Sequence, residues 1–280
     1  MTSREGTAAM LQSAPDESYL VDTQDGVLRL SFNRPQQGNA IPKAMVPLLT
    51  DLFRAAQADR TVRCILVRGE GKVFSAGGDV AGFADSIKQD VAVRQSDFAR
   101  RLPLARALVE AIVAFDRPIV VSVRGAAAGA GLFYPLIADY AIGDDSATFV
   151  FAHQRVGLSP DGGVTAVLPQ VVGTRMARML LITGAKVDSV EALRLGMLHK
   201  IVRADALDEE AMKIARRLAQ APQLAVVQAK RLVNDAAARS LAQILDAETD
   251  GIVACVGDAD FEEGVTAFLE KRAPAFPSAR

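Results

Sequence analysis

Residues 119–131 read IVVSVRGAAAGAG, and this stretch decides which fold we expect. Its first five residues are mostly β-branched, which is typical of a buried strand. Small residues occupy 125–131, and the apolar residues around 129–137 favour a helix after them. A strand followed by small residues and a helix start presents free main-chain N–H groups, which suit an anion or a developing oxyanion. A tight turn that packs a helix onto a strand needs the same residues, so both interpretations stay open.

A second cluster of small residues follows another apolar run. Residues 64–67 (CILV) predict a short buried strand, and residues 71–80 read GKVFSAGGDV. Ser75, Ala76, Gly77 and Gly78 let a ligand approach the backbone closely, and glycine tolerates dihedral angles that other residues resist. The stretch therefore raises the question of what its main-chain N–H groups bind.

Strand and helix patterns alternate along the first 203 residues. Residues 27–32 alternate like a strand, residues 44–58 have helical spacing with Pro47 in the first turn, and residues 102–115 predict a further helix. This alternation favours a parallel sheet with helical crossovers, so the expected fold class is α/β. Residues 205–272 look almost wholly helical. We therefore expect a flexible tail over residues 1–15, an α/β core over 16–204 and a helical region over 205–280.

Composition excludes several classes of function. The chain has 280 residues, is 50% hydrophobic and carries 32 basic and 33 acidic residues, so no surface for nucleic acid is expected. The longest apolar run, residues 118–123, is too short to cross a membrane, and the N-terminal residues do not resemble a secretory signal. Cys64 and Cys255 lack metal-ligand spacing and suggest a reducing compartment. The expectation is a soluble cytoplasmic protein without a metal site.

Five ordered motifs resemble those of the crotonase superfamily, the enoyl-CoA hydratase/isomerase family. Residues 33–35 and 39–40 resemble the opening NRP…NA pattern, and residues 69–79 resemble G.G..F.AG.D. Residues 117–131 are similar to KP…NG.A.GGG, with Ala130 where the family usually has glycine. Residues 157–163 (GLSPDGG) resemble GL.P.GG, and residues 268–272 (FLEKR) resemble the closing AF.EKR. The resemblance covers nearly the whole chain after the expected tail.

The resemblance implies a spiral of ββα turns, a helical C-terminal region that forms trimers, and an acyl-coenzyme A thioester as the substrate. In the family, two main-chain N–H groups hold the thioester oxygen, and by motif position they belong to Gly78 and Ala130. Coenzyme A enters as part of the substrate, so no separate cofactor is implied. The expected assembly is a homotrimer or a dimer of trimers. The residues expected to contact coenzyme A, the last two from the same or a neighbouring subunit, are Ala40, Ala76, Gly77, Gly78, Asp79, Val80, Phe268 and Lys271.

Acid–base residues, rather than the oxyanion donors, decide the reaction. The two glutamates of family hydratases fall on Phe133 and His153 here, so neither carboxylate is present. A third position, which carries the catalytic carboxylate in isomerase and dehalogenase branches, falls on Asp161. The resemblance therefore favours an enoyl-CoA isomerase in which Asp161 moves a proton between carbons. The alternatives are a hydratase-like or other thioester reaction, such as hydrolysis or ring rearrangement, and a degenerate acyl-CoA-binding protein.

Several of these residues also have structural interpretations. Asp161 would serve as the N-cap of a helix over residues 164–171. His153 could act as a base or orient the substrate, or it could pack among apolar neighbours. Asp79 could fix its loop or cap the next helix. Of the remaining candidates, an acyl pocket or the core is expected for Phe133 and Tyr134, a structural role for His199, and a solvated helical face for Lys230 and Arg231.

Overall fold

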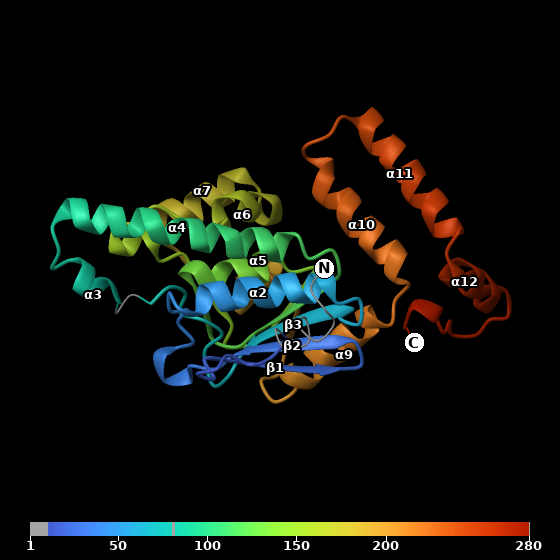
Figure 1. Ribbon diagram of the computed structural model, residues 1–280, viewed down its shortest axis with the longest axis horizontal. Helices are drawn as coiled ribbons and strands as arrows, with labels where there is room; N and C mark the ends of the chain where they lie inside the picture. Colours follow the sequence, from blue (N-terminus) through green and yellow to red (C-terminus); the bar gives the residue numbers. More distant parts are fainter. Residues whose placement is uncertain (1–10, 80–81, 280) are drawn as a thin grey trace.

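A six-stranded sheet forms the centre of the computed structural model, which describes residues 11–79 and 82–279 (Figure 1). The strands lie in the order β1-β2-β3-β4-β6-β9. β1 and β2 form an antiparallel hairpin, and the later neighbours in the sheet are parallel, as predicted. The strands are β1 (Tyr19–Gln24), β2 (Val27–Phe32), β3 (Cys64–Gly69), β4 (Ile119–Val123), β6 (Tyr140–Asp144) and β9 (Lys200–Val202).

The central strands are buried on both faces of this sheet. Every side chain of β4 is buried, and β3 is buried apart from Arg68. Ile65 and Val67 belong to the core on one face, whereas Cys64 and Leu66 belong to the core on the other. Parallel sheets are covered by helices on both faces, which explains why these strands read as continuous apolar runs.

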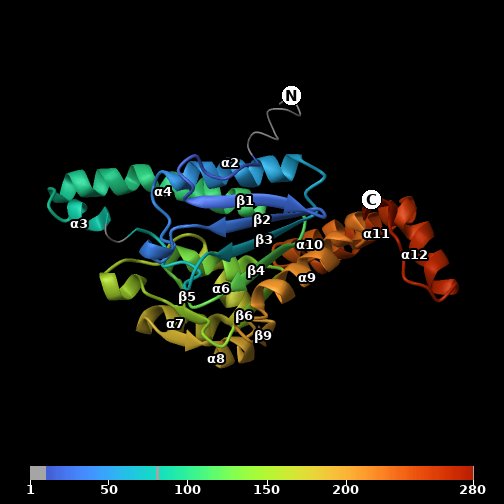
Figure 2. The ribbon, with the colours of Figure 1, turned by 90° about the horizontal axis from the view of Figure 1, so that it is seen from below.

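Helices cover the two faces of the sheet (Figures 1 and 2). α2 (Met45–Ala58), α4 (Val91–Val113) and α5 (Phe133–Ile137) lie on one face, and α9 (Leu207–Ala219) lies on the other. α2 matches its prediction, and Pro47 lies in the first turn, where a missing N–H is tolerated. The short α3 (Phe83–Ser86) leads into α4 at the end of the molecule farthest from the C-terminal helices.

α4 is longer than the sequence predicted. It begins at Val91 rather than at residue 102, and Pro103 lies inside it. Its buried side chains, Leu108, Ala111 and Ile112, all lie in its second half. The first turns of such a helix carry no buried stripe, so they give no apolar periodicity to detect.

α9 belongs to the core, which therefore extends beyond the predicted boundary at residue 204. Its side chains Leu207, Ala211 and Ile214 form a buried cluster with Leu66 and Val120 of the sheet. Helical spacing predicted an amphipathic helix, but spacing does not specify the surface that the apolar stripe contacts. The helical region that projects from the core begins after residue 221 (Figure 1).

A second, three-stranded sheet carries the small residues of 125–131. Its order is β5-β7-β8, with β5 parallel to β7 and β7 antiparallel to β8. The 3-10 helix η3 runs directly into α5, so the helix predicted over residues 129–137 begins as a tighter turn. The elements of this part are β5 (Ala126–Ala128), η3 (Gly129–Leu132), β7 (Thr148–Val150), the 3-10 helix η4 (His153–Val156), α6 (Val164–Val172), α7 (Thr174–Thr183), β8 (Lys186–Asp188) and α8 (Ser189–Arg194).

Residues 11–15, which we expected to belong to the tail, lie against the core instead. Ala14 is buried, and its N–H donates to the carbonyl oxygen of Tyr19 at 3.0 Å. The N–H of Val21 donates to the hydroxyl of Ser13 at 2.8 Å. Residues 1–10 of the expected tail lie outside the described residues.

The C-terminal helices project from the body of the molecule (Figures 1 and 2). They are α10 (Gln223–Ala236), α11 (Leu241–Val256) and α12 (Ala259–Leu269), which confirms the predicted helical region. In the part of the chain that the structure describes, no helix is long and apolar enough to cross a membrane. Large apolar side chains are exposed on the three helices, among them Val233, Leu241, Ile252, Val253, Phe268 and Leu269.

Lys230 attaches this projecting region to the sheet. Its Nζ donates to Oδ2 of Asp139 and to the carbonyl oxygen of Arg117, both at 2.8 Å. Oδ2 of Asp139 also accepts the N–H of Ile119, the first residue of β4, at 2.7 Å. The Lys230 side chain is only 13% exposed, so the prediction of a solvated face was wrong at this position.

Arg117, just before β4, holds the end of α2. Its guanidinium is buried and lies 4.6 Å from the centre of the Phe115 ring. It donates to the carbonyl oxygens of Ala56 (2.7 Å) and Gln57 (2.8 Å), which are among the last carbonyls of α2 and lack partners within the helix. Burial lowers the pKa of the guanidinium, and the neighbouring Asp116 carboxylate opposes this effect.

Replacing Arg117 with methionine would leave these carbonyl oxygens buried without donors. Each unsatisfied buried polar group costs about 1–3 kcal/mol, so Arg117→Met should lower the free energy of unfolding by about 3 kcal/mol or more. Urea denaturation followed by circular dichroism measures the loss. Arg106→Met, which removes an exposed arginine on α4, is the control and should change little. An Arg117→Met protein as stable as this control would contradict the role.

Candidate active site

Three segments that follow β2, β3 and β4 pair with one another at the carboxyl edge of the sheet. The N–H of Ile41 donates to the carbonyl oxygen of Gly77 at 2.7 Å. On the other side, the N–H of Ser75 donates to the carbonyl oxygen of Ala126 at 3.0 Å. The first cluster of small residues is therefore held between the segment after β2 and the second cluster.

Glycine lets the two clusters touch through their backbones. A Cβ atom on Gly77 would lie 2.4 Å from the carbonyl oxygen of Ala128 and 2.9 Å from the nitrogen of Ala130. A Cβ atom on Gly131 would lie 2.8 Å from Cβ of Ser75. Atoms at these distances overlap, so only glycine fits at either position. The clusters that the sequence analysis singled out are close neighbours in the fold.

Asn39 joins the segment after β2 to the first cluster. Its Nδ2 donates to the carbonyl oxygens of Glu70 (2.9 Å) and Val73 (2.6 Å), and its Oδ1 accepts the N–H of Arg34 (2.8 Å). The hydroxyl of Ser75 donates to the Asn39 carbonyl oxygen at 2.9 Å. Asn39 belongs to the NRP…NA motif, but the motif did not predict a function for it. Its buried side chain sets the positions of the segments that form the site.

Gly78 and Ala130 line one cavity of about 360 Å³. Across residues 11–79 and 82–279, neither N–H donates to another segment of the chain. Ala130 lies in the first turn of η3, where N–H groups have no partner within the helix. A Cβ atom on Gly78 would meet no atom within 4 Å, so the space beside this residue is open. Both residues therefore line the cavity with N–H groups that no other described segment accepts.

The other walls of the cavity are mainly apolar and come from α2, α4 and α5. An apolar chamber with a few polar groups at one place suits an acyl chain joined to a polar carbonyl. α4 was not predicted to line a cavity, because helical spacing over residues 102–115 does not specify the surface that its apolar side chains face. The apolar walls include Val46, Leu102, Val109, Ile112, Phe133 and Tyr134.

Asp161 lies on the wall of the same cavity. Its side chain is 50% exposed, and its Oδ1 lies 3.3 Å from Nε2 of His153. The expected capping role was wrong, because the N-cap of α6 is Gly163, which has a φ of +80° and no side chain to bond the helix. The carboxylate is therefore available to a ligand.

His153 is buried in η4 and faces Asp161 through Nε2. Its other ring nitrogen, Nδ1, is also buried and has no hydrogen-bond partner among the described residues. The structure thus brings together the two side chains that the sequence analysis offered as alternative acid–base groups.

Phe133 stands where the resemblance places a hydratase glutamate. Its side chain is buried and lines the cavity, so it belongs to both the core and the pocket. A Cβ atom on Gly163 would lie 2.9 Å from Cε2 of the Phe133 ring, so the ring packs directly against the turn after Asp161. An aromatic ring at this position cannot orient or activate a water molecule.

Tyr134 adds an aromatic surface beside Phe133. Its ring packs edge-to-face against Phe32 (5.1 Å between centroids) and Phe74 (6.3 Å). Within the described chain its hydroxyl has no hydrogen-bond partner, and burial raises the pKa of this phenol. The phenol therefore remains neutral at physiological pH.

The residues expected to contact coenzyme A fall into two groups. Ala40, Ala76, Gly77 and Asp79 lie in or beside the three paired segments, where Ala76 is exposed and Asp79 lines the cavity. Asp79 does not cap α3 with its side chain. Val80 lies outside the described residues. The first group is therefore contiguous with Gly78 and Ala130.

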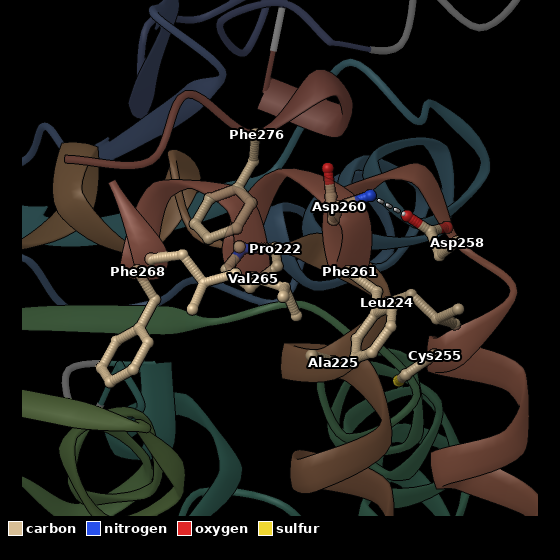
Figure 3. Close-up of a pocket in the computed structure, with 12 residues that line it drawn as sticks. Pro222, Leu224, Ala225, Cys255, Asp258, Asp260, Phe261, Val265, Phe268 and Phe276 are labelled. Carbon is tan, nitrogen blue, oxygen red and sulfur yellow. Dashed lines mark hydrogen bonds between the residues drawn. The ribbon is translucent and has the colours of Figure 1, made fainter. Parts of the chain in front are cut away.

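Phe268 and Lys271 form the second group and lie on the projecting C-terminal region. Phe268 is 82% exposed near the end of α12, and Lys271 follows the helix with a φ of +55°. Phe268 lines a separate cavity of about 400 Å³ between α10, α11 and α12, together with Phe261 and Val265 (Figure 3). Within one chain, the structure does not bring this group to Gly78.

His199 has the structural role that the sequence analysis assigned to it. Its Nδ1 accepts the N–H of Ala141 at 3.0 Å, and its ring stacks on Tyr140 with the centroids 4.8 Å apart. The side chain thus joins the approach to β9 to the neighbouring strand β6.

Comparison with known proteins identifies the family. Residues 22–279 match the family model described as enoyl-CoA hydratase/isomerase. The protein belongs to the enoyl-CoA hydratase/isomerase family. The crotonase resemblance and its spiral fold are thereby confirmed, and the protein is an acyl-CoA enzyme of this family.

The relatives of this protein include both isomerases and hydratases by name. An Escherichia coli (strain K12) protein named 1,2-epoxyphenylacetyl-CoA isomerase is 33% identical over 93% of this chain and 98% of its own length. A Syntrophomonas wolfei protein named crotonyl-CoA hydratase is 31% identical over 94% and 98%. The crystal structure of an enoyl-CoA hydratase from Polaromonas sp. JS666 has a TM-score of 0.84 at 28% identity, covering 91% of this chain and 98% of that one. Similarity therefore fixes the family but not the reaction.

Alanine substitutions at Gly77 and Gly78 form a matched pair that tests the contact between the two clusters. Gly77→Ala places a methyl group against the Ala128 carbonyl at a φ of +87°, so we expect a loss of about 2 kcal/mol or more in the free energy of unfolding. Gly78→Ala meets open space, and its stability should stay within about 0.5 kcal/mol of wild type. Chemical denaturation of both variants checks this. Equal losses would show that the two clusters do not touch as described.

Proposed function

We propose that the protein moves a carbon–carbon double bond within an enoyl-CoA thioester, as an isomerase. The observation that carries the proposal is the shared cavity of Gly78, Ala130 and Asp161. Two main-chain donors and one carboxylate are the groups required to stabilise an enolate and to move its proton. The apolar walls accommodate the acyl chain next to them.

The main-chain amides of Gly78 and Ala130 act on the thioester oxygen. When a proton leaves carbon 2, negative charge develops on this oxygen, and donors that are already in place stabilise it without reorganisation. Loss of one such donor typically lowers the rate by about 10²–10³-fold. The close packing of the two clusters at Gly77 supports this role, because it holds both amides in fixed positions.

Asp161 acts as the base and then as the acid. Its carboxylate removes a proton from carbon 2 of a 3-enoyl thioester, which leaves a dienolate held at the oxygen. The protonated side chain then returns the proton to carbon 4, and the product is a 2-enoyl thioester. The atoms balance without any other reactant, so one carboxylate is sufficient for the whole reaction.

Phe133 favours proton transfer over hydration. Hydration requires a water molecule that is oriented and activated beside carbon 3, a task for which the family uses carboxylates. The ring of Phe133 occupies one of these positions and is buried against the turn after Asp161. His153 occupies the other position and contacts Asp161.

Asp161→Asn tests the proposal. It should lower kcat for conversion of 3-enoyl-CoA to 2-enoyl-CoA by about 10²–10⁴-fold, the usual contribution of a general base. Absorbance of the conjugated product measures the reaction. Asp51→Asn, which changes an exposed carboxylate on α2 outside the cavity lining, is the control and should retain activity. Full activity of Asp161→Asn would remove Asp161 from the mechanism.

A panel of thioester substrates separates the alternative functions. Wild-type protein is tested on straight-chain 2-enoyl and 3-enoyl thioesters and on an aromatic epoxide thioester, because one relative is named 1,2-epoxyphenylacetyl-CoA isomerase. Mass spectrometry identifies hydrated, hydrolysed or rearranged products. Tight binding of acyl-CoA without turnover of any thioester would indicate a binding protein instead.

We also propose that α10, α11 and α12 pack against other copies of this chain in a trimer. Ile252 and Val253 are 67% and 68% exposed on adjacent positions of α11, and apolar side chains on α10 and α12 are exposed as well. Exposed apolar surface of this extent marks protein–protein contact. Such packing would bring Phe268 and Lys271 of one subunit close to the cavity of its neighbour. The family resemblance predicts that these two residues contact coenzyme A bound there.

The double substitution Ile252→Glu and Val253→Glu should convert the trimer to monomers. Burying two carboxylates in an apolar contact is strongly unfavourable, because each would lose its hydration. Analytical ultracentrifugation at micromolar concentration measures the mass. Glu248→Gln on the same helix is the control and should remain trimeric. A monomeric wild-type protein would refute the assembly.

A further inference from the structure

We propose that His153 is a positioning residue that holds the Asp161 carboxylate toward the ligand. This inference rests on the proposed function, because His153 acts through the base rather than on the substrate. Asp161 and His153, which the sequence offered as alternative acid–base groups, then have separate roles.

Asp161 needs such a partner because its own turn does not fix the carboxylate. The turn contains Gly157, Gly162 and Gly163, all at positive φ, so the backbone around Asp161 follows a path that glycine allows. The side chain does not cap α6 and is half exposed. In the described part of the chain, its carboxylate contacts Nε2 of His153 at 3.3 Å.

His153 is itself held firmly. Arg155, on the same 3-10 helix, donates through Nε and Nη2 to the carbonyl oxygen of Gly184 at 3.0 and 2.7 Å. The carbonyl oxygen of His153 accepts the N–H of Leu158 at 3.0 Å, which closes the turn that leads to Asp161. The His153 side chain is only 9% exposed. A buried, anchored ring can therefore restrain a half-exposed carboxylate.

The surroundings of the His153 ring determine which of its two nitrogens carries the proton. Nδ1 is buried and has no acceptor among the described residues, so a proton there would be an unsatisfied buried donor. In the neutral ring the proton therefore belongs on Nε2, which lies 3.3 Å from Oδ1 of Asp161. Contacts of this kind often shorten when a ligand binds. Oδ2 is then left to take the proton of the substrate.

Three variants test the role of the imidazole. His153→Leu removes the donor, and we expect kcat to fall by about 10–10²-fold with KM unchanged, as for a displaced catalytic group. His153→Gln keeps an N–H at a similar distance and should recover most of this loss. Gln154→Leu, on the exposed side of the same 3-10 helix, should behave as wild type.

A double-mutant cycle separates this inference from the proposed function. If His153 acts through Asp161, His153→Leu should not lower the residual rate of Asp161→Asn any further. An equal loss in both backgrounds would overturn the inference, as would a His153→Leu enzyme as fast as wild type beside an inactive Asp161→Asn. An active Asp161→Asn would instead overturn the proposed function. Should His153→Leu fail to fold, His153→Phe replaces it in the same cycle.

Nitrogen-15 NMR of the two histidines gives a readout that does not depend on activity. We expect the His153 ring to carry its proton on Nε2 and its signals to shift in Asp161→Asn. The signals of His199, which stacks on Tyr140, should stay in place and serve as the internal control. A proton on Nδ1 of His153, or signals unchanged in Asp161→Asn, would contradict the contact.

Discussion

The contact between the backbones of two small-residue clusters is the constraint on which the site depends. Gly77 lies so close to Ala128 and Ala130 that no side chain fits between them. Hydrogen bonds from Ile41 and Ser75 hold the first cluster on both sides. Preorganised donors stabilise developing charge better than donors that must move, so this packing connects the glycines of the sequence directly to the proposed chemistry.

The remainder of the fold holds these two clusters in fixed positions relative to each other. The strands before each cluster are buried on both faces and fix the directions in which the chain leaves the sheet. Arg117 ties the end of α2 to the start of β4, and Lys230 ties α10 to the same place. α2 and α4 then form the apolar walls on which an acyl chain would lie. Gly78, Ala130 and the walls of the cavity thus share one support.

The sequence predicted local features well and contacts between distant segments poorly. Strand β4 and helix α2 were found because their apolar spacing is a property of consecutive residues. The start of α4, the place of α9 in the core and the ion pair between Lys230 and Asp139 were missed, because each depends on which surface a helix meets. The resemblance brought Gly78, Ala130 and Asp161 together in advance. The contact of His153 with Asp161 required the three-dimensional structure, since no spacing rule specifies it.

The proposed use of the Ala130 backbone N–H as a binding group has a consequence. Every residue except proline carries the same N–H, so exchange of the side chain at this position leaves the donor in place. Residues such as Phe133 and Asp161 that line the cavity can therefore change without removing the proposed donor. If the proposal holds, the acid–base residues of such a site can change while its backbone still binds the thioester carbonyl.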